Sequence, residues 1–182
     1  MTKIAEQKFQ APLLVVVMGV SGTGKTTLAS KIADYFNLRF LDADSLHSDA
    51  AIKQMSQGIA LTNEQRLPWI ERICDQLSEL AAHQQSCVLA YSGLKQQHRH
   101  LIFSSYPNSV GILLNADQAI IAQRLQTRRN HFMSPQLLSS QIASMEPFAD
   151  EPNLLKLDLS ETLENLLLQS VNFINLQHIA EH

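Results

Sequence analysis

The sequence predicts an α/β fold, an open, doubly wound parallel sheet of about five strands with flanking helices and a small lid. Two observations support this fold class. Short apolar runs alternate along the chain with segments of helical periodicity, and a glycine-rich loop directly follows the first apolar run. In a sheet of this kind, ligand-binding groups gather at the carboxyl ends of the strands.

The apolar runs have the length and composition of buried parallel strands. They are Leu13–Met18, Arg39–Leu41, Cys87–Tyr91, Val110–Leu114 and Leu154–Leu157. The stretch before them, Met1–Gln10, is polar and aperiodic, and we expect it to form a flexible N-terminal tail.

The segments between the runs carry helix signals. A helical pattern over Thr27–Tyr35 follows the glycine-rich loop. Further along, Thr62 and Gln65 have the spacing of a capping box, and Ser134 followed by Pro135 is typical of a helix start. Two sets of apolar residues then repeat at helical spacing: Trp69, Ile73, Leu77 and Leu80, and Leu163, Leu167, Val171 and Ile174.

The composition limits both the domain count and the ligand classes. The chain has 182 residues, 45% of them hydrophobic, so we expect one domain over 11–182. A formal net charge of −3 gives no general basic field for nucleic acid. The apolar stretch Ala11–Val20 is shorter than the roughly 20 residues of a membrane span. With only Cys74 and Cys87, and no metal or disulfide pattern, the sequence predicts a soluble cytoplasmic protein without membrane partners.

The glycine-rich loop Gly19–Thr26 reads GVSGTGKT, which matches the phosphate-loop pattern G-x-x-x-x-G-K-[ST]. Gly22 and Gly24 let the backbone turn with its N–H groups directed at a phosphate chain. Lys25 is expected to reach the terminal phosphates, and the Thr26 hydroxyl to ligate Mg²⁺. The expected nucleotide contacts are Gly19, Ser21, Gly22, Thr23, Gly24, Lys25, Thr26 and Thr27.

Two carboxylates follow the second apolar run, in the sequence Leu41-Asp42-Ala43-Asp44. Residues two apart on a strand point to the same side, so both acids are expected to face one crevice. Phosphoryl transfer uses one carboxylate at magnesium and another to orient or deprotonate the attacking hydroxyl. We assign Asp42 to the metal side and Asp44 to the hydroxyl; the alternative for Asp44 is a helix cap.

Other phosphate-loop classes lack their signatures in this chain. A GTP switch protein normally carries N-K-x-D, but Asn115-Ala116-Asp117 has no lysine. A motor or transporter ATPase normally ends an apolar strand with Asp-Glu, whereas the run from Cys87 ends in Tyr91-Ser92-Gly93. A small kinase that phosphorylates a metabolite remains as the leading class.

Cationic residues gather in short segments, as a protein that binds two anions requires. Lys95 and Arg99 lie four apart after the third strand and are expected to share a helix face. Arg124 and Arg128 have the same spacing further along, followed by Arg129 and by His131 with Phe132. The alternative is that these arginines lie on the solvated faces of ordinary helices and bind no ligand. His47, beyond the acids, could bond a polyol or cap a helix.

Several ordered motifs resemble those of the gluconate kinases, which have the fold of shikimate and nucleoside-monophosphate kinases. The motifs are MGVSGTGKTT, FLDADSLH, KQMSQGIALTNEQRLPW, SGLKQQHR, RLQTRRNHFM and SQIASMEP, spread from Val17 to about Pro147. The resemblance implies ATP and Mg²⁺ as cofactors, a homodimer, and transfer to the 6-hydroxyl of D-gluconate to give 6-phosphogluconate.

The resemblance also implies roles for single residues. Asp44 is similar to the acceptor-binding acid and base of the family, and Asp42 to its magnesium-side acid. The sugar-acid pocket is matched by His47, Arg66, Lys95 and Arg99. On the ATP side, Arg124 resembles the adenine- and phosphate-side arginine, and Arg128–Phe132 a lid, expected over about 128–135, that closes over ATP. Lys25, Asp44 and Arg128 are the expected catalytic residues.

The chain departs from the family pattern mainly on the acceptor side. Alanine replaces the usual Asn and Pro, neutral residues replace acids, His replaces Asp, and Asn replaces Gly; the positions are Ala51, Ala60, Asn63, Gln65, His100 and Asn130. Two alternatives therefore stay open. One is a related kinase acting on shikimate, another sugar acid or a nucleotide, and the other is a nucleotide-binding regulatory protein with weak catalysis.

Overall fold

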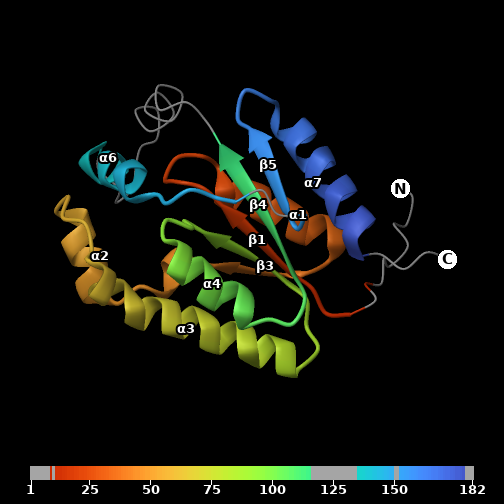
Figure 1. The fold of residues 1–182 in the computed structure, drawn as a ribbon, viewed down its shortest axis with the longest axis horizontal. Coiled ribbons are helices and arrows are strands. Elements are labelled where there is room, and N and C mark those ends of the chain that lie inside the picture. Colours follow the sequence, from red (N-terminus) through yellow and green to blue (C-terminus); the bar gives the residue numbers. More distant parts are fainter. Residues whose placement is uncertain (1–8, 10, 116–134, 150–151, 179–182) are drawn as a thin grey trace.

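A computed structural model of the chain describes residues 9, 11–115, 135–149 and 152–178 (Figure 1). Its centre is a sheet of five parallel strands in the order β2-β3-β1-β4-β5. The strands are β1 Leu14–Met18, β2 Arg39–Asp42, β3 Cys87–Tyr91, β4 Ser109–Asn115 and β5 Leu154–Asp158. The predicted fold class and all the predicted strands are confirmed, with ends that differ by a single residue.

Helices cover both faces of the sheet, as the fold class requires (Figure 1). One face carries α1 (Lys25–Phe36) and α7 (Leu163–His178), and the other carries α3 (Asn63–Ala82) and α4 (Gln96–Ser104). At the carboxyl ends of the strands lie the short η1 (Ala43–Leu46), α2 (Asp49–Ser56) and α6 (Pro135–Ser144). Figure 1 shows α2 and α6 beside each other at the edge of the molecule.

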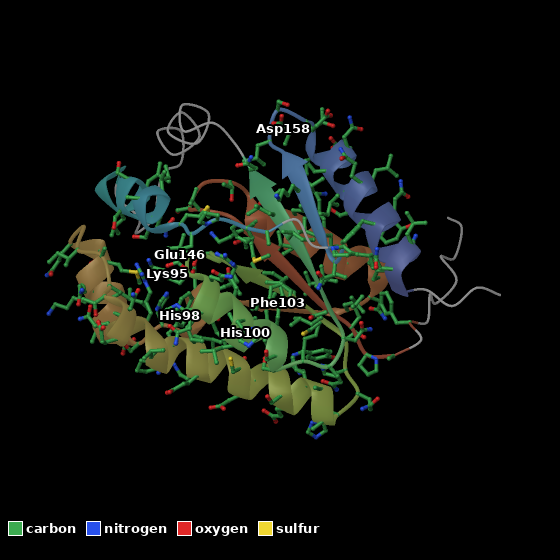
Figure 2. All side chains as sticks on the ribbon, viewed as in Figure 1. Lys95, His98, His100, Phe103, Glu146 and Asp158 are labelled. Atoms are coloured by element: carbon green, nitrogen blue, oxygen red, sulfur yellow. The ribbon has the colours of Figure 1, made fainter. Side chains whose placement is uncertain are left out.

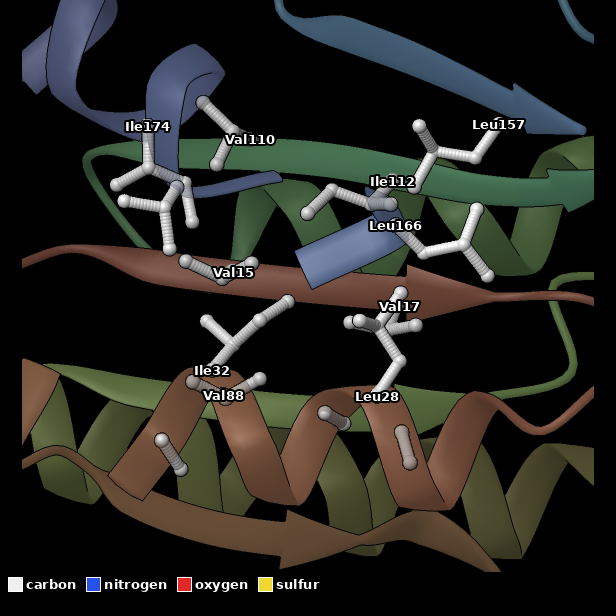
Figure 3. Close-up of a cluster of buried hydrophobic side chains, with 14 of the residues drawn as sticks. Val15, Val17, Leu28, Ile32, Val88, Val110, Ile112, Leu157, Leu166 and Ile174 are labelled. Carbon is white, nitrogen blue, oxygen red and sulfur yellow. The ribbon is translucent and has the colours of Figure 1, made fainter. Parts of the chain in front are cut away.

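The core forms on both faces because strand β1 is apolar at every position and fully buried. Val15 and Val17 pack toward α1 and α7, where they meet Leu28, Ile32 and Ile174 (Figure 3). The alternate residues of β1 pack on the other face against α3 and α4. Because the central strand is held from both sides, the loop that follows Met18 begins from a rigid position.

Local signals fix the helix starts near this edge. The predicted capping box at α3 is present: the Gln65 N–H donates to Thr62 Oγ1 at 3.3 Å, and the Thr62 N–H donates to Gln65 Oε1 at 2.9 Å. Helix α6 begins at Pro135 as predicted. Its expected cap, Ser134, and most of the expected lid lie outside the described residues.

Two further predictions meet the structure only in part. Within the expected N-terminal tail, residues 1–8 and 10 lie outside the described residues, but the ring of Phe9 packs against Phe36 at a centroid distance of 5.4 Å. Among the helices that the structure describes, none is long and apolar enough to cross a membrane.

Candidate active site

The loop between β1 and α1 has the conformation that its glycines allow. Gly24, the residue before α1, has a φ of 89°, which is favourable only for glycine. At Gly19, a Cβ atom would lie 2.7 Å from Thr23 Oγ1, so a side chain there would collide with the loop. Thr23 braces the turn by donating to the carbonyl of Val20 at 2.9 Å. The loop thus leads directly into the N-terminus of a 12-residue helix, a favourable place for phosphate.

Two polar side chains at this loop have no hydrogen-bond or ion-pair partner among the described residues, which is the arrangement that a phosphate ligand would complete. The side chain of Lys25 is buried, with 7% of its surface exposed, and no described carboxylate lies within ion-pair distance. The Ser21 hydroxyl is also buried and has no hydrogen-bond partner in the described structure. A buried cation and hydroxyl are costly without partners, so these residues fit a nucleotide phosphate chain. Thr26 and Thr27 are exposed at the start of α1.

The two carboxylates lie near this loop, but they do not both lie on the strand, as the sequence predicted. Strand β2 ends at Asp42, and Asp44 belongs to η1 rather than to the strand. The capping residue is Asp42, not Asp44, because Asp42 Oδ1 accepts the Asp44 N–H at 3.0 Å. The 3-10 turn forms because the carboxylate of Asp42 satisfies a free N–H at its start. This cap also sets the relative positions of the two acids.

Asp42 lies in a mixed electrostatic environment beside the phosphate loop. Burial raises the pKa of its carboxyl above the ordinary value, and the nearby charge of Asp44 acts in the same direction. The Asp44 N–H, the Lys25 ammonium and the Thr26 hydroxyl all act to lower it. Asp42 and Thr26 therefore lie close enough to serve one cation together. A bound Mg²⁺ would supply an opposite charge to a carboxylate whose pKa is raised mainly by burial, so the pair fits this ion.

Metal binding by protein groups alone has no support in the described residues. They include no group of three or more His, Cys, Asp or Glu side chains placed to hold a metal ion. Magnesium at nucleotide sites typically uses one or two protein ligands and completes its shell with phosphate oxygens and water. Thr26 and Asp42 have the chemistry for such a shared site.

A pocket beside the phosphate loop brings together four of the residues that the sequence assigned to catalysis and acceptor binding. They are Lys25, Asp44, His47 and Arg66. They come from α1, η1, the residue after η1, and α3. The remaining walls are Met55, Ala60, Leu61, Trp69, Ser92, Leu94, Leu137, Ser140 and Gln141. The lysine of the phosphate loop, a carboxylate and a guanidinium thus share one cavity.

His47 is held in this pocket by Trp69. The two rings stack with centroids 4.1 Å apart and an interplanar angle of 18°. Trp69 Nε1 also donates to the Ala43 carbonyl at 2.6 Å, so the same indole fixes η1, which carries Asp44. Burial lowers the pKa of His47, with the charges of Arg72 and Arg66 acting in the same direction against that of Asp44. The buried Nδ1 of this neutral ring has no partner among the described residues.

Arg66 brings a second positive charge to this pocket. Its guanidinium is partly buried, which lowers its pKa from the ordinary value, but arginine remains charged in proteins. Nη1 donates to the Asn63 side-chain oxygen at 3.4 Å. Asn63 is neutral, and no described carboxylate lies within 4.0 Å of the guanidinium. The charge of Arg66 is therefore available to a carboxylate ligand.

Lys95 and Arg99 share one helix face as predicted, but that face meets the segment after α6 rather than the pocket. Lys95 Nζ lies 3.1 Å from Glu146 Oε1, and Figure 2 shows the two side chains next to each other. The buried Arg99 guanidinium donates to four backbone carbonyls and lies 3.9 Å above the ring of Phe148. These carbonyls belong to Gly93, Leu94, Glu146 and Pro147. Substrate binding by Lys95 and Arg99 stays a prediction.

Sequence reasoning missed three residues that shape the site. Trp69 was identified only by its helical spacing, and its bond to the Ala43 carbonyl gives no sequence signal. Glu146 caps α4 by accepting the Gln96 N–H at 2.6 Å, across 50 positions. Gln141 accepts the Ser21 N–H of the phosphate loop at 2.7 Å, across 120 positions. Gln141 and Glu146 both lie in the motif SQIASMEP, which was the available signal.

Arg124, Arg128, Arg129 and His131 lie outside the described residues, so their roles at ATP and in the lid stay predictions.

Comparisons with known proteins agree on one family. A protein family described as "AAA domain" matches residues 14–152. The thermosensitive gluconokinase of Escherichia coli (strain K12) is 38% identical over 155 residues, which cover 85% of this chain and 83% of that protein. A crystal structure of a sugar kinase from Janibacter sp. HTCC2649 has a TM-score of 0.86 and 34% identity, covering 90% of this chain and 95% of that one. For a gluconokinase from Sinorhizobium meliloti 1021 the TM-score is 0.81, with 30% identity over 91% and 94%.

Proposed function

The chain belongs to the gluconokinase family of P-loop kinases, and from this premise we propose that it phosphorylates D-gluconate with ATP to give 6-phospho-D-gluconate. The observation that carries the proposal is the single pocket that joins Lys25 of the phosphate loop to Asp44, His47 and Arg66. A donor site alone would be common to all P-loop proteins. The adjoining carboxylate and guanidinium supply what a hydroxyl acceptor with a carboxylate group needs.

Asp44 is proposed to act as the general base. It lies in the pocket with Lys25, and its backbone N–H is held by the Asp42 cap, so its carboxylate is presented from a fixed turn. A carboxylate there orients the attacking hydroxyl and accepts its proton as the new bond to phosphorus forms. Lys25 then stabilises the negative charge on the transferring phosphoryl group.

Arg66 and His47 are proposed to bind gluconate itself. The guanidinium of Arg66 can hold the carboxylate of the sugar acid through two N–H bonds. His47 lines the pocket and can bond a substrate hydroxyl through its imidazole, and stacking on Trp69 orients the ring for this contact. Lys95 and Arg99, which the resemblance also assigns to substrate, bind the 146–147 segment here, so we place the carboxylate at Arg66.

Water must be kept away from the phosphoryl group, because it competes with gluconate as acceptor. The pocket walls include the apolar side chains of Met55, Leu61, Leu94 and Leu137. Arg124, on the predicted adenine and phosphate side, and Arg128, in the predicted lid, would add cations at ATP when the lid closes. Thr26 and Asp42 are proposed to hold Mg²⁺, which supplies charge neutralisation at the phosphates when bound. We also propose a cytoplasmic homodimer, as the family resemblance implies; the unpaired Cys74 and Cys87 suit a reducing compartment.

An ADP-release assay with purified protein tests this function over a panel of acceptors. The panel contains D-gluconate, other aldonates, shikimate and nucleoside monophosphates, each with and without Mg²⁺. We expect the highest kcat/KM on D-gluconate and loss of turnover on metal removal. Preference for shikimate or a nucleotide would indicate the related-kinase alternative. ATP binding without turnover on any acceptor would indicate the regulatory alternative.

A further inference from the structure

Helix α6 contacts the phosphate loop through a hydrogen bond and through apolar packing. The Ser21 N–H donates to Gln141 Oε1 at 2.7 Å. One turn earlier, Leu138 packs with Val20 of the loop and with Leu94. The loop is therefore held on one side by β1 and on the other by α6.

The same helix forms part of the acceptor side. Leu137, the neighbour of Leu138, packs against Met55 at the end of α2 and against Leu61 before α3. Leu137, Ser140 and Gln141 all line the pocket that contains Asp44 and Arg66. Adjacent residues of α6 thus contact the donor loop and the acceptor wall, so a shift of α6 would move both contacts.

The segment that directly follows α6 is anchored to the body of the protein. The Glu146 N–H donates to the Leu94 carbonyl at 2.8 Å, and its carboxylate holds Lys95 and the Gln96 N–H. These hydrogen bonds lower the pKa of Glu146, which keeps it ionised. Because the segment after α6 is fixed, the position of Gln141 is defined, and its contact with the phosphate loop is not incidental.

We propose that Gln141 is a positioning residue that couples the ATP site to the gluconate site by fixing the phosphate loop at Ser21 to α6. This inference rests on the proposed function. Gln141 suits the task because its amide oxygen accepts an N–H without adding a negative charge near bound phosphates. Nucleotide binding to the loop and acceptor binding against Leu137 then both favour the same placement of α6. By linkage, each substrate strengthens the binding of the other to the same extent.

The test compares Gln141→Met, Gln141→Glu and the control Gln169→Met in the full chain. Gln169 is exposed on α7, away from the site. The probe is a non-hydrolysable ATP analogue with Mg²⁺, titrated by calorimetry with and without D-gluconate. Steady-state kcat and KM are measured for both substrates, and thermal unfolding checks that each variant folds.

We expect gluconate to tighten analogue binding about fivefold or more in the wild type and in Gln169→Met, which is typical of coupled sites. In Gln141→Met this factor should fall to about one and kcat should fall about tenfold, because the loop loses its acceptor but not its packing. Gln141→Glu keeps an oxygen at that place and adds a charge, so analogue affinity should fall about tenfold or more.

Wild-type coupling and kcat in Gln141→Met would overturn the proposal. If Gln141→Met fails to fold, the proposal is tested with Gln141→Glu only. Unchanged affinity of that variant for the ATP analogue would then overturn the proposal. Absence of wild-type turnover on gluconate would instead refute the proposed function. The effect of Gln141→Glu on nucleotide affinity would still test the loop contact, so the two failures are distinguishable.

Discussion

The indole of Trp69 stacks on the imidazole of His47 and donates a hydrogen bond to the carbonyl of Ala43, between the two acids of the site. One buried side chain of α3 thereby holds both the turn that carries Asp44 and the ring of His47, which lines the same pocket. The part of the pocket that contains Asp44 and His47 is therefore assembled around this tryptophan, the single tryptophan of the chain.

Replacing Trp69 with Phe should keep the stacking surface and remove the hydrogen bond to Ala43. The buried carbonyl then loses its partner, so the free energy of unfolding should fall by about 1–3 kcal/mol. Because η1 loosens, the KM for gluconate should rise more than the KM for ATP. Urea unfolding and steady-state kinetics measure the two effects, and equal changes in both KM values would contradict this role.

Replacing Arg66 with Met should weaken gluconate binding and spare the nucleotide. Loss of a charge-assisted contact with a carboxylate costs about 2 kcal/mol or more, which corresponds to a rise in gluconate KM of at least roughly thirtyfold. Arg39→Met, at an exposed position on β2, is the matched control. If the gluconate KM of Arg66→Met stayed near that of the control, the carboxylate would have to bind elsewhere.

Replacing Asp44 with Asn should remove the base and leave the nucleotide site intact. We expect kcat to fall by about 10²- to 10⁴-fold, the usual contribution of a general base. Affinity for a non-hydrolysable ATP analogue should stay within about twofold of wild type, because in the described structure no hydrogen bond or ion pair joins the Asp44 side chain to the phosphate loop. Asp34→Asn, exposed on α1, controls for a lost carboxylate. A near-normal kcat would exclude Asp44 as the base.

Stability should fall as the pH is lowered through the histidine range. Burial lowers the pKa of both His47 and His98 below the ordinary value of 6.5. The unfolded chain therefore takes up protons first as the pH falls below 6.5, and the free energy of unfolding decreases until the folded-state pKa is passed.

The contribution of His47 to this pH dependence can be isolated by mutation. Between about pH 7.5 and about pH 5.5, the loss of stability should be smaller in His47→Gln than in wild type, by about 1.4 kcal/mol for each unit of pKa shift. His83→Gln, at an exposed position, controls for the loss of an imidazole. Urea unfolding at each pH is the measurement, and parallel curves for His47→Gln and wild type would contradict a buried neutral ring.

Local chemistry made much of the fold predictable from sequence. The Thr62 capping box depends only on residues three apart, and the buried strands depend only on apolar runs, so both could be predicted. The phosphate loop is a contiguous motif for the same reason. At Asp44 the pattern was misleading. The sequence predicted both acids on the strand, but Asp42 caps a 3-10 turn that follows the strand, and Asp44 lies in that turn.

Contacts between distant segments were beyond sequence reasoning. Two such contacts depend on where α6 and the segment after it lie in the fold. They are the hydrogen bond between Gln141 and Ser21, and those between Arg99 and the carbonyls of the 146–147 segment. Spacing placed Lys95 and Arg99 on one face correctly, but it gave no information on what that face meets. The charge of these residues therefore did not reveal that Lys95 contacts Glu146 and that Arg99 contacts its neighbours, and their binding of substrate stays a prediction.

The central claim is that the protein phosphorylates gluconate at its terminal hydroxyl, in the pocket lined by Lys25 and Asp44. The most direct measurement is proton-coupled ³¹P NMR of the product formed from ATP, Mg²⁺ and D-gluconate. The account predicts one new phosphomonoester signal split into a triplet by the two protons of a terminal CH₂ group. A doublet would show transfer to a secondary hydroxyl, and inorganic phosphate alone would show hydrolysis; either result would contradict the claim.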